Sequence, residues 1–229
     1  MNIIFNGGTK GIGREIVIRF ASDPGNKVIV TGRDEKALQS LSAAFTNVKS
    51  YCLDLTAFES QKKGLYNLIN IEFERVDILI NIAGLLITGD FVDVASDDGR
   101  LMMETNFFGP ASLIRELRPF MPAGAHIVNI SSMGGFQGST KYRGLAYYSA
   151  SKAALNCLTE CLAVEFKDYG INVNCLALGA VQTEMFSQAF PGYEAPVEPV
   201  QMAEFICGFA VTGHKYFNGR ILPVALGNP

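Results

Sequence analysis

The chain has 229 residues, of which 48% are hydrophobic and 18% charged, and this composition excludes a disordered protein and suits a packed globular one. Its 19 basic and 22 acidic residues give a net charge of −3, so it lacks the basic excess of nucleic-acid-binding proteins and we expect no nucleic-acid partner. The longest apolar run, residues 78–89, contains Asn81, Gly84 and Gly89 and is too short to cross a bilayer, so we expect no membrane association.

The N-terminus and the cysteines favour a cytoplasmic protein. Residues 1–8 contain no basic segment and reach glycine at Gly7, which is not typical of a signal peptide. The five cysteines are odd in number and mostly lie in apolar runs, so we expect buried free thiols in a reducing compartment. Cys157 and Cys161 lie four residues apart, but the chain has only two histidines and no Cys-x-x-Cys, and we expect no metal site.

Short β-branched runs alternate with longer helical patterns along the whole chain. Strands are expected at residues 3–5, 28–31, 48–53, 77–80, 126–130, 172–176 and 221–224. A capping box from Thr56 to Glu59, and a cap at Ser96 followed by two acids, mark two helix starts. The alternation predicts an α/β fold, with one doubly wound parallel sheet of about seven strands, helices on both faces and a single domain over residues 1–229.

A glycine-rich turn follows the first predicted strand. Residues 6–13 read Asn-Gly-Gly-Thr-Lys-Gly-Ile-Gly, and a helical pattern begins directly afterwards. Glycines let a backbone turn tightly and approach a pyrophosphate, and a helix N-terminus offers free N–H groups with a partial positive charge. The spacing Gly7-x-x-x-Gly11-x-Gly13 therefore predicts a dinucleotide site, the alternative being a tight strand–helix turn without a ligand.

The end of the second predicted strand indicates which dinucleotide binds. NAD-selective sites place an acid there, which bonds the ribose 2′-hydroxyl. This strand instead ends in Thr31, Gly32 and Arg33. A guanidinium can bind a 2′-phosphate through two hydrogen bonds, and Lys10 in the glycine turn adds a second cation. We therefore expect NADP(H) as the cofactor, the alternative being that Arg33 and Lys10 are solvated surface cations.

Tyr148 and Lys152 lie four residues apart at the start of a helical pattern, so their side chains share one helix face. A free tyrosine titrates at a pH of about 10. A nearby ammonium and the positive nicotinamide of NADP⁺ favour the phenolate, and we expect them to lower the pKa of Tyr148 toward neutrality. Upstream, the strand at residues 126–130 ends in Ser131 and Ser132, whose hydroxyls can point into the ligand crevice of a parallel sheet.

Together these motifs resemble those of the short-chain dehydrogenase/reductase family, which has a single Rossmann-type domain, over nearly the full chain. The matching pieces occur in the family's order: Gly7-x-x-x-Gly11-x-Gly13, Asp54-Leu55, Asn81-Ile-Ala-Gly84, Asn106, Ser132, Tyr148-x-x-x-Lys152, Asn174 and Gly179-Ala-Val181-Gln-Thr183. Asn6, Ile82 and Leu178 depart from the family's usual residues. The 16 positions from Ser132 to Tyr148 are more than usual, and we assign the surplus to a loop around residues 141–144.

The resemblance implies an enzyme that interconverts a carbonyl and an alcohol by hydride transfer with NADP(H). It implies that Tyr148 is the general acid/base and that Ser132 polarises the substrate carbonyl. It further implies that Lys152 binds the nicotinamide ribose and lowers the pKa of Tyr148, and that Asn106 holds a water in a proton relay. The remaining cofactor-binding residues expected from the resemblance are Gly7, Thr9, Lys10, Gly11, Ile12, Gly13, Arg33, Asp54 (at the adenine amino group), Leu55, Asn81, Ala83, Gly84, and Val181 and Thr183 (at the carboxamide).

Residues 184–198 match the family's substrate lid and contain three aromatic residues but no lysine or arginine. We therefore expect a neutral or weakly polar small-molecule carbonyl, although Lys141 and Arg143 could supply positive charge from the other side. Two alternatives stay open: a 3-oxoacyl-thioester reductase and a non-catalytic NADP(H)-binding redox sensor. The resemblance also implies a homodimer or homotetramer that pairs through the helices near residues 98–119 and 147–168.

Overall fold

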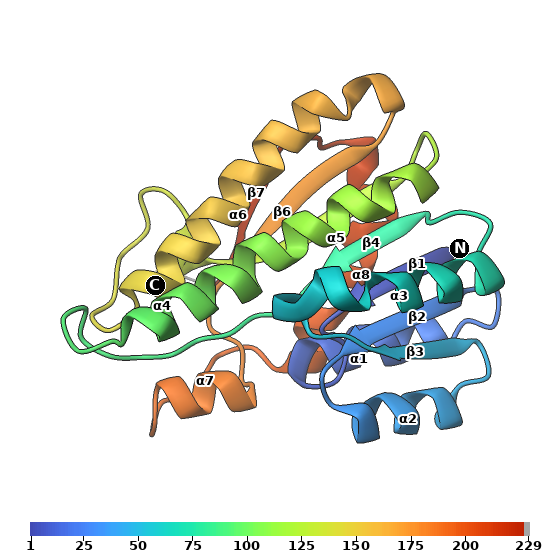
Figure 1. Ribbon diagram of the computed structural model, residues 1–229. Helices are drawn as coiled ribbons and strands as arrows, with labels where there is room; N and C mark the ends of the chain where they lie inside the picture. Colours follow the sequence, from blue (N-terminus) through green and yellow to red (C-terminus); the bar gives the residue numbers. More distant parts are fainter. Residues whose placement is uncertain (227–229) are drawn as a thin grey trace.

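All seven predicted strands form one parallel sheet in the computed structural model, which describes residues 1–226 (Figure 1). The strands are β1 (Asn2–Asn6), β2 (Lys27–Gly32), β3 (Val48–Cys52), β4 (Ile78–Asn81), β5 (His126–Ser132), β6 (Asn172–Leu178) and β7 (Ile221–Val224). Their order in the sheet is β3-β2-β1-β4-β5-β6-β7, so the order reverses between β1 and β4. Ligands of open parallel sheets bind beyond the carboxyl ends of the strands at such a reversal.

The connections between strands are mainly helical. The helices are α1 (Gly11–Ala21), α2 (Glu35–Ala44), α3 (Phe58–Glu72), α4 (Ser96–Met103), α5 (Gly109–Leu117), α6 (Ala146–Glu165), α7 (Glu184–Ala189) and α8 (Pro199–Thr212). A π-helical turn at Glu104–Phe108 joins α4 to α5, and 3₁₀ turns occur at Leu55–Ala57, Arg118–Phe120, Met133–Gly135, Lys167–Tyr169 and Gly213–Lys215. None of the helices between residues 1 and 226 has the length and hydropathy that a bilayer-spanning segment needs.

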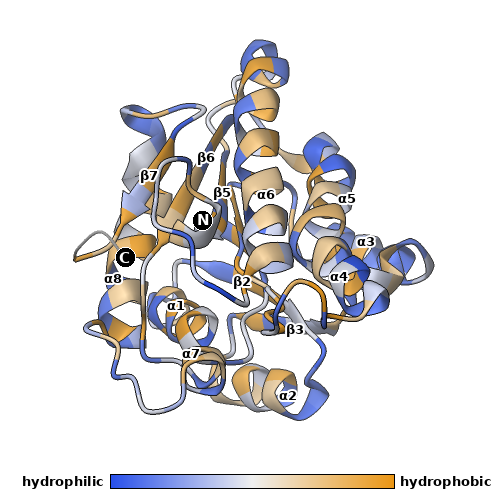
Figure 2. Cartoon of the chain, turned by 90° about the vertical axis from the view of Figure 1, so that its left-hand side faces the viewer, coloured by the Kyte–Doolittle hydropathy of each residue, from blue (hydrophilic) through white to orange (hydrophobic). Residues whose placement is uncertain are grey.

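The sheet separates two hydrophobic cores, as expected for a doubly wound fold. Buried residues of α1, α2 and α8 pack on one face, and those of α3, α5 and α6 pack on the other. In Figure 2 the helices carry orange apolar stretches beside blue polar ones, the mixture expected of helices with one face on a core. The predicted doubly wound parallel sheet with helices on both faces is therefore confirmed.

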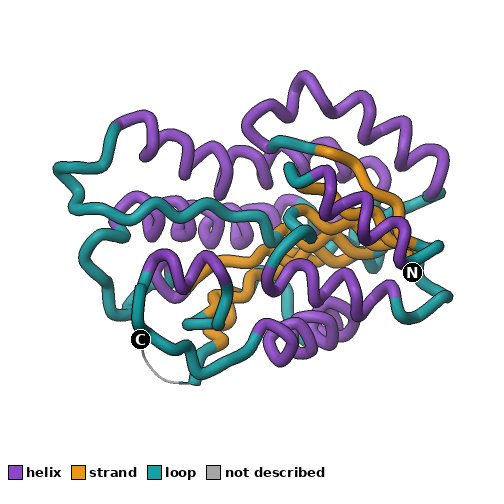
Figure 3. Tube along the Cα trace, turned by 90° about the horizontal axis from the view of Figure 1, so that it is seen from below, coloured by secondary structure: helices purple, strands orange, loops and turns teal. Residues whose placement is uncertain are grey.

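Long connections gather at the carboxyl ends of the strands. Figure 3 shows extended loops at one end of the sheet, away from the N-terminus, and Figure 1 shows the β4–α4 and β5–α6 connections and α7 on that side. β5 and β6 run two residues further than predicted, to Ser132 and Leu178. This edge therefore carries both the glycine turn and the serine and tyrosine motifs.

Two of the predicted helix caps are wrong in detail. The Thr56–Glu59 capping box does not form, because the carboxylate of Asp54 accepts hydrogen bonds from both the backbone N–H and the hydroxyl of Thr56. α3 instead begins at Phe58. Helix α4 does begin at Ser96, but the capping position is Ala95, and Ser96 makes no side-chain cap. The two acids of its first turn are present as predicted.

The prediction that the cysteines are buried is also wrong for most of them. All five are free thiols, but Cys52, Cys157 and Cys161 are exposed, and only Cys175 and Cys207 are buried. Cys157 and Cys161 are exposed because the apolar stretch of α6 includes residues on the outer face of this long helix. Their spacing of four residues places both cysteines on that face.

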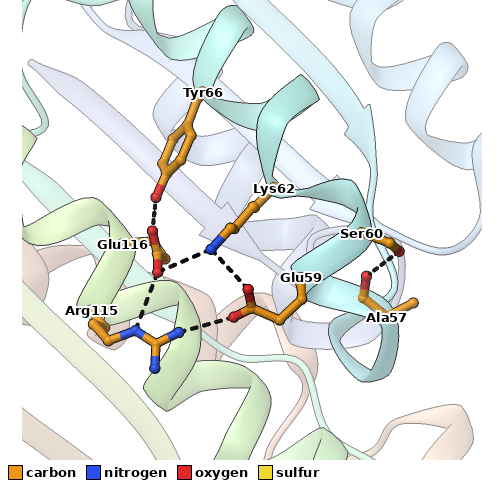
Figure 4. A network of polar contacts seen from close by, with 7 residues as sticks. All are labelled: Ala57, Glu59, Ser60, Lys62, Tyr66, Arg115 and Glu116. Carbon is orange, nitrogen blue, oxygen red and sulfur yellow. Dashed lines mark hydrogen bonds and ion pairs between the residues drawn. The ribbon is translucent and has the colours of Figure 1, made fainter.

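A polar network joins α3 to α5 on the outside of the molecule (Figure 4). The Lys62 ammonium lies 2.8 Å from Glu59 and 3.5 Å from Glu116, and Arg115 pairs with the same two carboxylates at 2.9 and 3.2 Å. Tyr66 donates its hydroxyl to Glu116, and burial beside that carboxylate raises the pKa of Tyr66. Since α5 follows the π-helical turn, this network helps to fix the backbone that carries Asn106.

His126, at the start of β5, is held as a neutral imidazole. Its Nδ1–H donates to the carbonyl of Ala210 at 2.9 Å, and its Nε2 accepts from Asn174 at 3.0 Å. The side chain is almost fully buried, and desolvation lowers the pKa of His126 to about 4. The pKa of the neighbouring His214 is lowered for the same reason.

The His126 shift predicts a loss of stability in mild acid. His126 takes up a proton at a pH of about 6.5 in the unfolded chain but only at about pH 4 in the folded protein. Between these two pH values the free energy of unfolding therefore falls by about 3 kcal/mol as the pH is lowered. Urea unfolding as a function of pH measures this loss. His126→Gln should flatten most of the dependence, whereas His214→Gln should leave most of it, and an unchanged pH profile in His126→Gln would contradict the assignment.

Candidate active site

The turn between β1 and α1 packs directly against its neighbours. Gly7 has a φ of +97°, and a side chain there would lie 2.4 Å from the backbone N of Ala83. A side chain at Gly13 would lie 2.1 Å from the carbonyl oxygen of Gly7. At Gly11, whose φ is +49°, the nearest atom is the methyl group of Thr183, at 3.2 Å. Two of the glycines are thus needed for close packing of the turn, and Gly11 faces the segment that leads to α7.

The N-terminus of α1 has the features of an anion site. No side chain caps this end, and its first turn contains no acid. Lys10 precedes the helix and lies 3.3 Å from Glu184 of α7. Arg33 follows β2, is exposed and makes no ion pair within residues 1–226, while Thr9 lies against Gly32 beside it. Free helix N–H groups and a nearby unpaired guanidinium are groups that bind anions such as the phosphates of a dinucleotide.

The connection after β4 is fixed by the side chain of Asn106. Its Oδ1 accepts from the backbone N–H of Leu85 at 2.7 Å, and its Nδ2 donates to Leu85 O at 2.8 Å and to Ser151 Oγ at 2.9 Å. A side chain at Gly84 would lie 3.4 Å from the Nζ of Lys152 and 3.6 Å from the Oδ1 of Asn106. Asn106, Gly84 and Lys152 therefore meet at one point, which brings together three of the residues expected to bind the cofactor or take part in catalysis.

Lys152 and Tyr148 approach each other on one face of α6. The Nζ of Lys152 lies 5.9 Å from the centre of the Tyr148 ring, and it donates a hydrogen bond to Ile130 O at 2.9 Å. Lys152 is only 4% exposed. The Oγ of Ser132 is half-buried and accepts from Gly134 N at 3.1 Å, whereas Ser131 is buried and donates to Lys152 O at 3.1 Å. Of the two serines, only Ser131 is bound to the main chain of α6.

The pKa of Tyr148 departs from the sequence prediction. Burial raises the pKa of Tyr148, and its contact with the Ser132 hydroxyl opposes this only in part. Burial also lowers the pKa of Lys152, to about 8. The expected lowering of the phenol pKa does not result from the protein groups alone, because loss of water around the phenol raises its pKa and the ammonium nitrogen is directed to the Ile130 carbonyl.

The other predicted cofactor residues lie at the same edge of the sheet. Asn81 is buried and donates to Asn129 at 2.9 Å, Asp54 stands at the end of β3, and Leu55 is buried under Gly109. Val181 is buried, and Thr183 caps α7 by accepting from the backbone N–H of Phe186 at 3.1 Å. Asn174 does not join this group, because its amide contacts His126 near the opposite edge of the sheet.

Sequence reasoning missed two contributors to the site. Ser151 is fully buried and accepts from Asn106, and the carbonyl of Ile130 holds the ammonium of Lys152. Ser151 could have been found from its place one residue before Lys152, on the turn that faces the sheet. A main-chain carbonyl has no signal in the sequence, since every residue carries one.

Comparison with known proteins identifies the family of this arrangement. The model of the short chain dehydrogenase family matches residues 1–194. The chain belongs to the short-chain dehydrogenase/reductase family. The resemblance of its motifs to that family is thereby confirmed, and the seven-stranded parallel sheet agrees with it.

Individual family members are similar to the chain at moderate identity. Dehydrogenase/reductase SDR family member 7B of Xenopus laevis is 31% identical over 202 residues, which cover 83% of this chain and 61% of the relative. The chain therefore spans less than two thirds of that relative's length. A short-chain dehydrogenase/reductase from Serratia marcescens is 25% identical with a TM-score of 0.86, covering 97% of this chain and 95% of the other. The structure of ElxO with NADP bound is 27% identical with a TM-score of 0.81, covering 97% and 96%.

The contacts of Asn106 predict that it stabilises the fold as well as the site. Asn106→Ala leaves the N–H and carbonyl of Leu85 and the hydroxyl of Ser151 without their partner, and we expect a loss of about 2 kcal/mol in the free energy of unfolding. Urea unfolding measures it. The matched control is Asn70→Ala on exposed α3 surface, which should change stability by less than about 0.5 kcal/mol. Equal effects of the two substitutions on the free energy of unfolding would contradict the stabilising role of the Asn106 hydrogen bonds.

Proposed function

We propose that the chain is an NADP(H)-dependent oxidoreductase that interconverts a small-molecule carbonyl and an alcohol, with Tyr148 as general acid/base. The observation that carries this proposal is the meeting of Tyr148, Ser132 and Lys152 at the carboxyl edge of the sheet, next to Gly84 and the uncapped N-terminus of α1. An acid, a hydroxyl donor and a buried cation are the groups that carbonyl reduction requires.

In the reductive direction the proton comes from Tyr148. NADPH, when bound, supplies the hydride that adds to the carbonyl carbon. A raised pKa keeps the Tyr148 phenol protonated, so it can donate to the carbonyl oxygen as negative charge develops there. Ser132 donates its hydroxyl to the same oxygen. The Lys152 ammonium then favours the phenolate that remains, and Asn106, through its bonds to Leu85 and Ser151, fixes the backbone beside this exchange.

The proposed preference for NADP(H) rests on the two cations at the α1 end of the site. Arg33 and Lys10 would bind the 2′-phosphate, and the similar ElxO is known with NADP bound. Gly7, Thr9, Gly11, Ile12 and Gly13 form the turn at the pyrophosphate. We assign the adenine side to Asp54 and Leu55, and the nicotinamide side to Asn81, Ala83, Gly84, Val181 and Thr183.

Three further parts of the proposal concern the surroundings of the site. Residues 184–198 serve as a substrate lid, in which Phe186 and Phe190 contact each other at 5.1 Å between ring centres. The chain forms a homodimer or homotetramer through α4, α5 and α6, where Leu101 of α4, Val164 of α6 and Phe108 of the π-helical turn between α4 and α5 are exposed. A location in the reducing cytoplasm rests on the sequence features described above.

Removal of the Tyr148 hydroxyl tests the reaction. Tyr148→Phe should lower kcat for reduction of a generic diketone by at least about a hundredfold, because the acid that protonates the carbonyl oxygen is lost. NADPH binding, measured by fluorescence titration, should change little. Tyr147→Phe, the adjacent tyrosine in α6, is the control and should retain activity. NADPH binding by the native chain without turnover of any carbonyl would instead favour the redox-sensor alternative.

Removal of the Arg33 guanidinium tests the cofactor preference. Arg33→Ala should weaken NADPH binding by about tenfold or more and leave NADH binding nearly unchanged, because only NADPH carries the 2′-phosphate. Titration of both nucleotides by protein fluorescence gives the two dissociation constants. The control is Arg14→Ala in α1, an exposed arginine that pairs with Glu15. A parallel loss for NADH and NADPH in Arg33→Ala would rule out the assigned contact.

A further inference from the structure

A pocket lies between the β4–α4 and β5–α6 connections, beside the catalytic end of α6. Its apolar lining is formed by Phe91, Tyr142, Leu145 and Ala146, and Ser149 also lines it. Ser149 directly follows Tyr148, so the pocket lies beside the turn of α6 that carries the proposed acid.

Gly134 links this pocket to the second reacting hydroxyl. A methyl group added at Gly134 would lie 2.9 Å from the Oγ of Ser149 and 3.5 Å from the Oγ of Ser132. The pocket-lining hydroxyl and the hydroxyl proposed to polarise the carbonyl thus flank one glycine. A molecule whose carbonyl reaches Ser132 and Tyr148 can therefore extend its remaining part past Ser149 into the pocket.

Both cations of the pocket are already engaged by protein groups. The Nε of Arg143 lies 2.6 Å from Oδ1 of Asp90, and its Nη2 pairs with the second oxygen of the same carboxylate. The Lys141 ammonium donates to Phe136 O and to Ser139 Oγ, each at 2.7 Å. The Arg143 fork, which could otherwise bind a carboxylate in two-point fashion, is thus occupied by Asp90.

The position of Asp90 is fixed by contacts on either side. Gly89 N donates to Gly144 O at 3.1 Å, and the rings of Phe91 and Tyr147 stack with their centres 5.4 Å apart. These contacts join the two connections at the residues next to the ion pair. The pairing holds the pKa of the Asp90 carboxyl below its usual range, so the carboxylate is charged throughout the neutral range.

We propose that this pocket binds the apolar part of a neutral carbonyl substrate, and that Asp90 determines this specificity by keeping Arg143 from anionic substrates. The inference rests on the proposed carbonyl reduction and names its substrate class, namely aromatic or aliphatic aldehydes and ketones without a carboxylate or phosphate. An anionic substituent in the pocket is repelled by the Asp90 carboxylate, and the Nε–Nη2 edge of Arg143 is already paired with that carboxylate, while the Lys141 ammonium is directed to Phe136 O and Ser139 Oγ. Apolar substituents contact Phe91, Tyr142, Leu145 and Ala146 instead.

A pair of substrates of nearly equal shape tests the inference. 4-Nitrobenzaldehyde is neutral, and 4-carboxybenzaldehyde carries a carboxylate in place of the nitro group. The native enzyme should reduce the nitro compound with the higher kcat/KM. Asp90→Asn should raise kcat/KM for the carboxylate relative to the nitro compound by about tenfold, mainly through KM, because Arg143 becomes available to the anion.

Two variants separate this effect from a structural one. Asp93→Asn removes an equal charge from the same connection and should leave the ratio unchanged, since Asp93 makes no ion pair among residues 1–226. Asp90→Asn combined with Arg143→Ala should return the ratio toward the native value. An unchanged ratio in Asp90→Asn, or an equal rise in Asp93→Asn, would overturn the inference.

Binding measurements keep the inference separate from the proposed reaction. If neither aldehyde is reduced, turnover of these two compounds does not report on the pocket, and saturation-transfer NMR of the same two aldehydes with the native chain and with Asp90→Asn still measures it. A selective gain in signal for 4-carboxybenzaldehyde in Asp90→Asn supports the role of Asp90. Equal signals for both compounds in both proteins would overturn it.

Discussion

Parallel pairing of the strands is the constraint on which the site depends. Because every strand runs the same way, the last residues of β1 and β4, Asn6 and Asn81, lie side by side, and Asn129, three residues before the end of β5, aligns with Asn81. The row is buried, and within residues 1–226 the Nδ2 of Asn6 and the Oδ1 of Asn81 have no hydrogen-bond partner. Ligands of parallel sheets bind beyond the carboxyl edge, so the unpartnered polar atoms fit the cofactor site proposed there.

One environment sets the protonation of both groups in the proposed acid/base pair. Desolvation disfavours the charged form of any group, so it lowers the pKa of Lys152 and raises that of Tyr148. The carbonyl of Ile130 compensates part of the burial of the ammonium. The protein alone therefore holds the phenol in its proton-donating form, which suits reduction, and a positive charge added beside the phenol would favour the reverse direction.

Most of the fold and the position of the candidate site could be predicted from the sequence. The periodicity of hydrophobic residues and the spacing of glycines depend on neighbouring residues only, so both can be recognised without the structure. The strand at residues 221–224 is confirmed without change, and Tyr148 and Lys152 meet as their spacing predicts. Local signals failed where two groups compete for one partner, as when Asp54 binds Thr56 and prevents its capping box. They also failed for burial, because the apolar stretch of α6 that contains Cys157 and Cys161 covers an exposed face as well.

The pairing of arginines with acids distinguishes the two ends of the proposed site, and only the structure shows it. Arg33 and Arg143 are both exposed arginines in connections at the carboxyl edge, and the sequence predicts that Arg33 binds a 2′-phosphate and that Arg143 could supply positive charge beside the substrate. Across 53 residues, Asp90 pairs with Arg143, whereas no acid within residues 1–226 pairs with Arg33. An exposed ion pair adds little to stability, but it removes a two-point anion ligand from the pocket. The guanidinium without an acidic partner therefore lies at the α1 end of the proposed site, whereas the guanidinium beside the pocket is paired with a carboxylate.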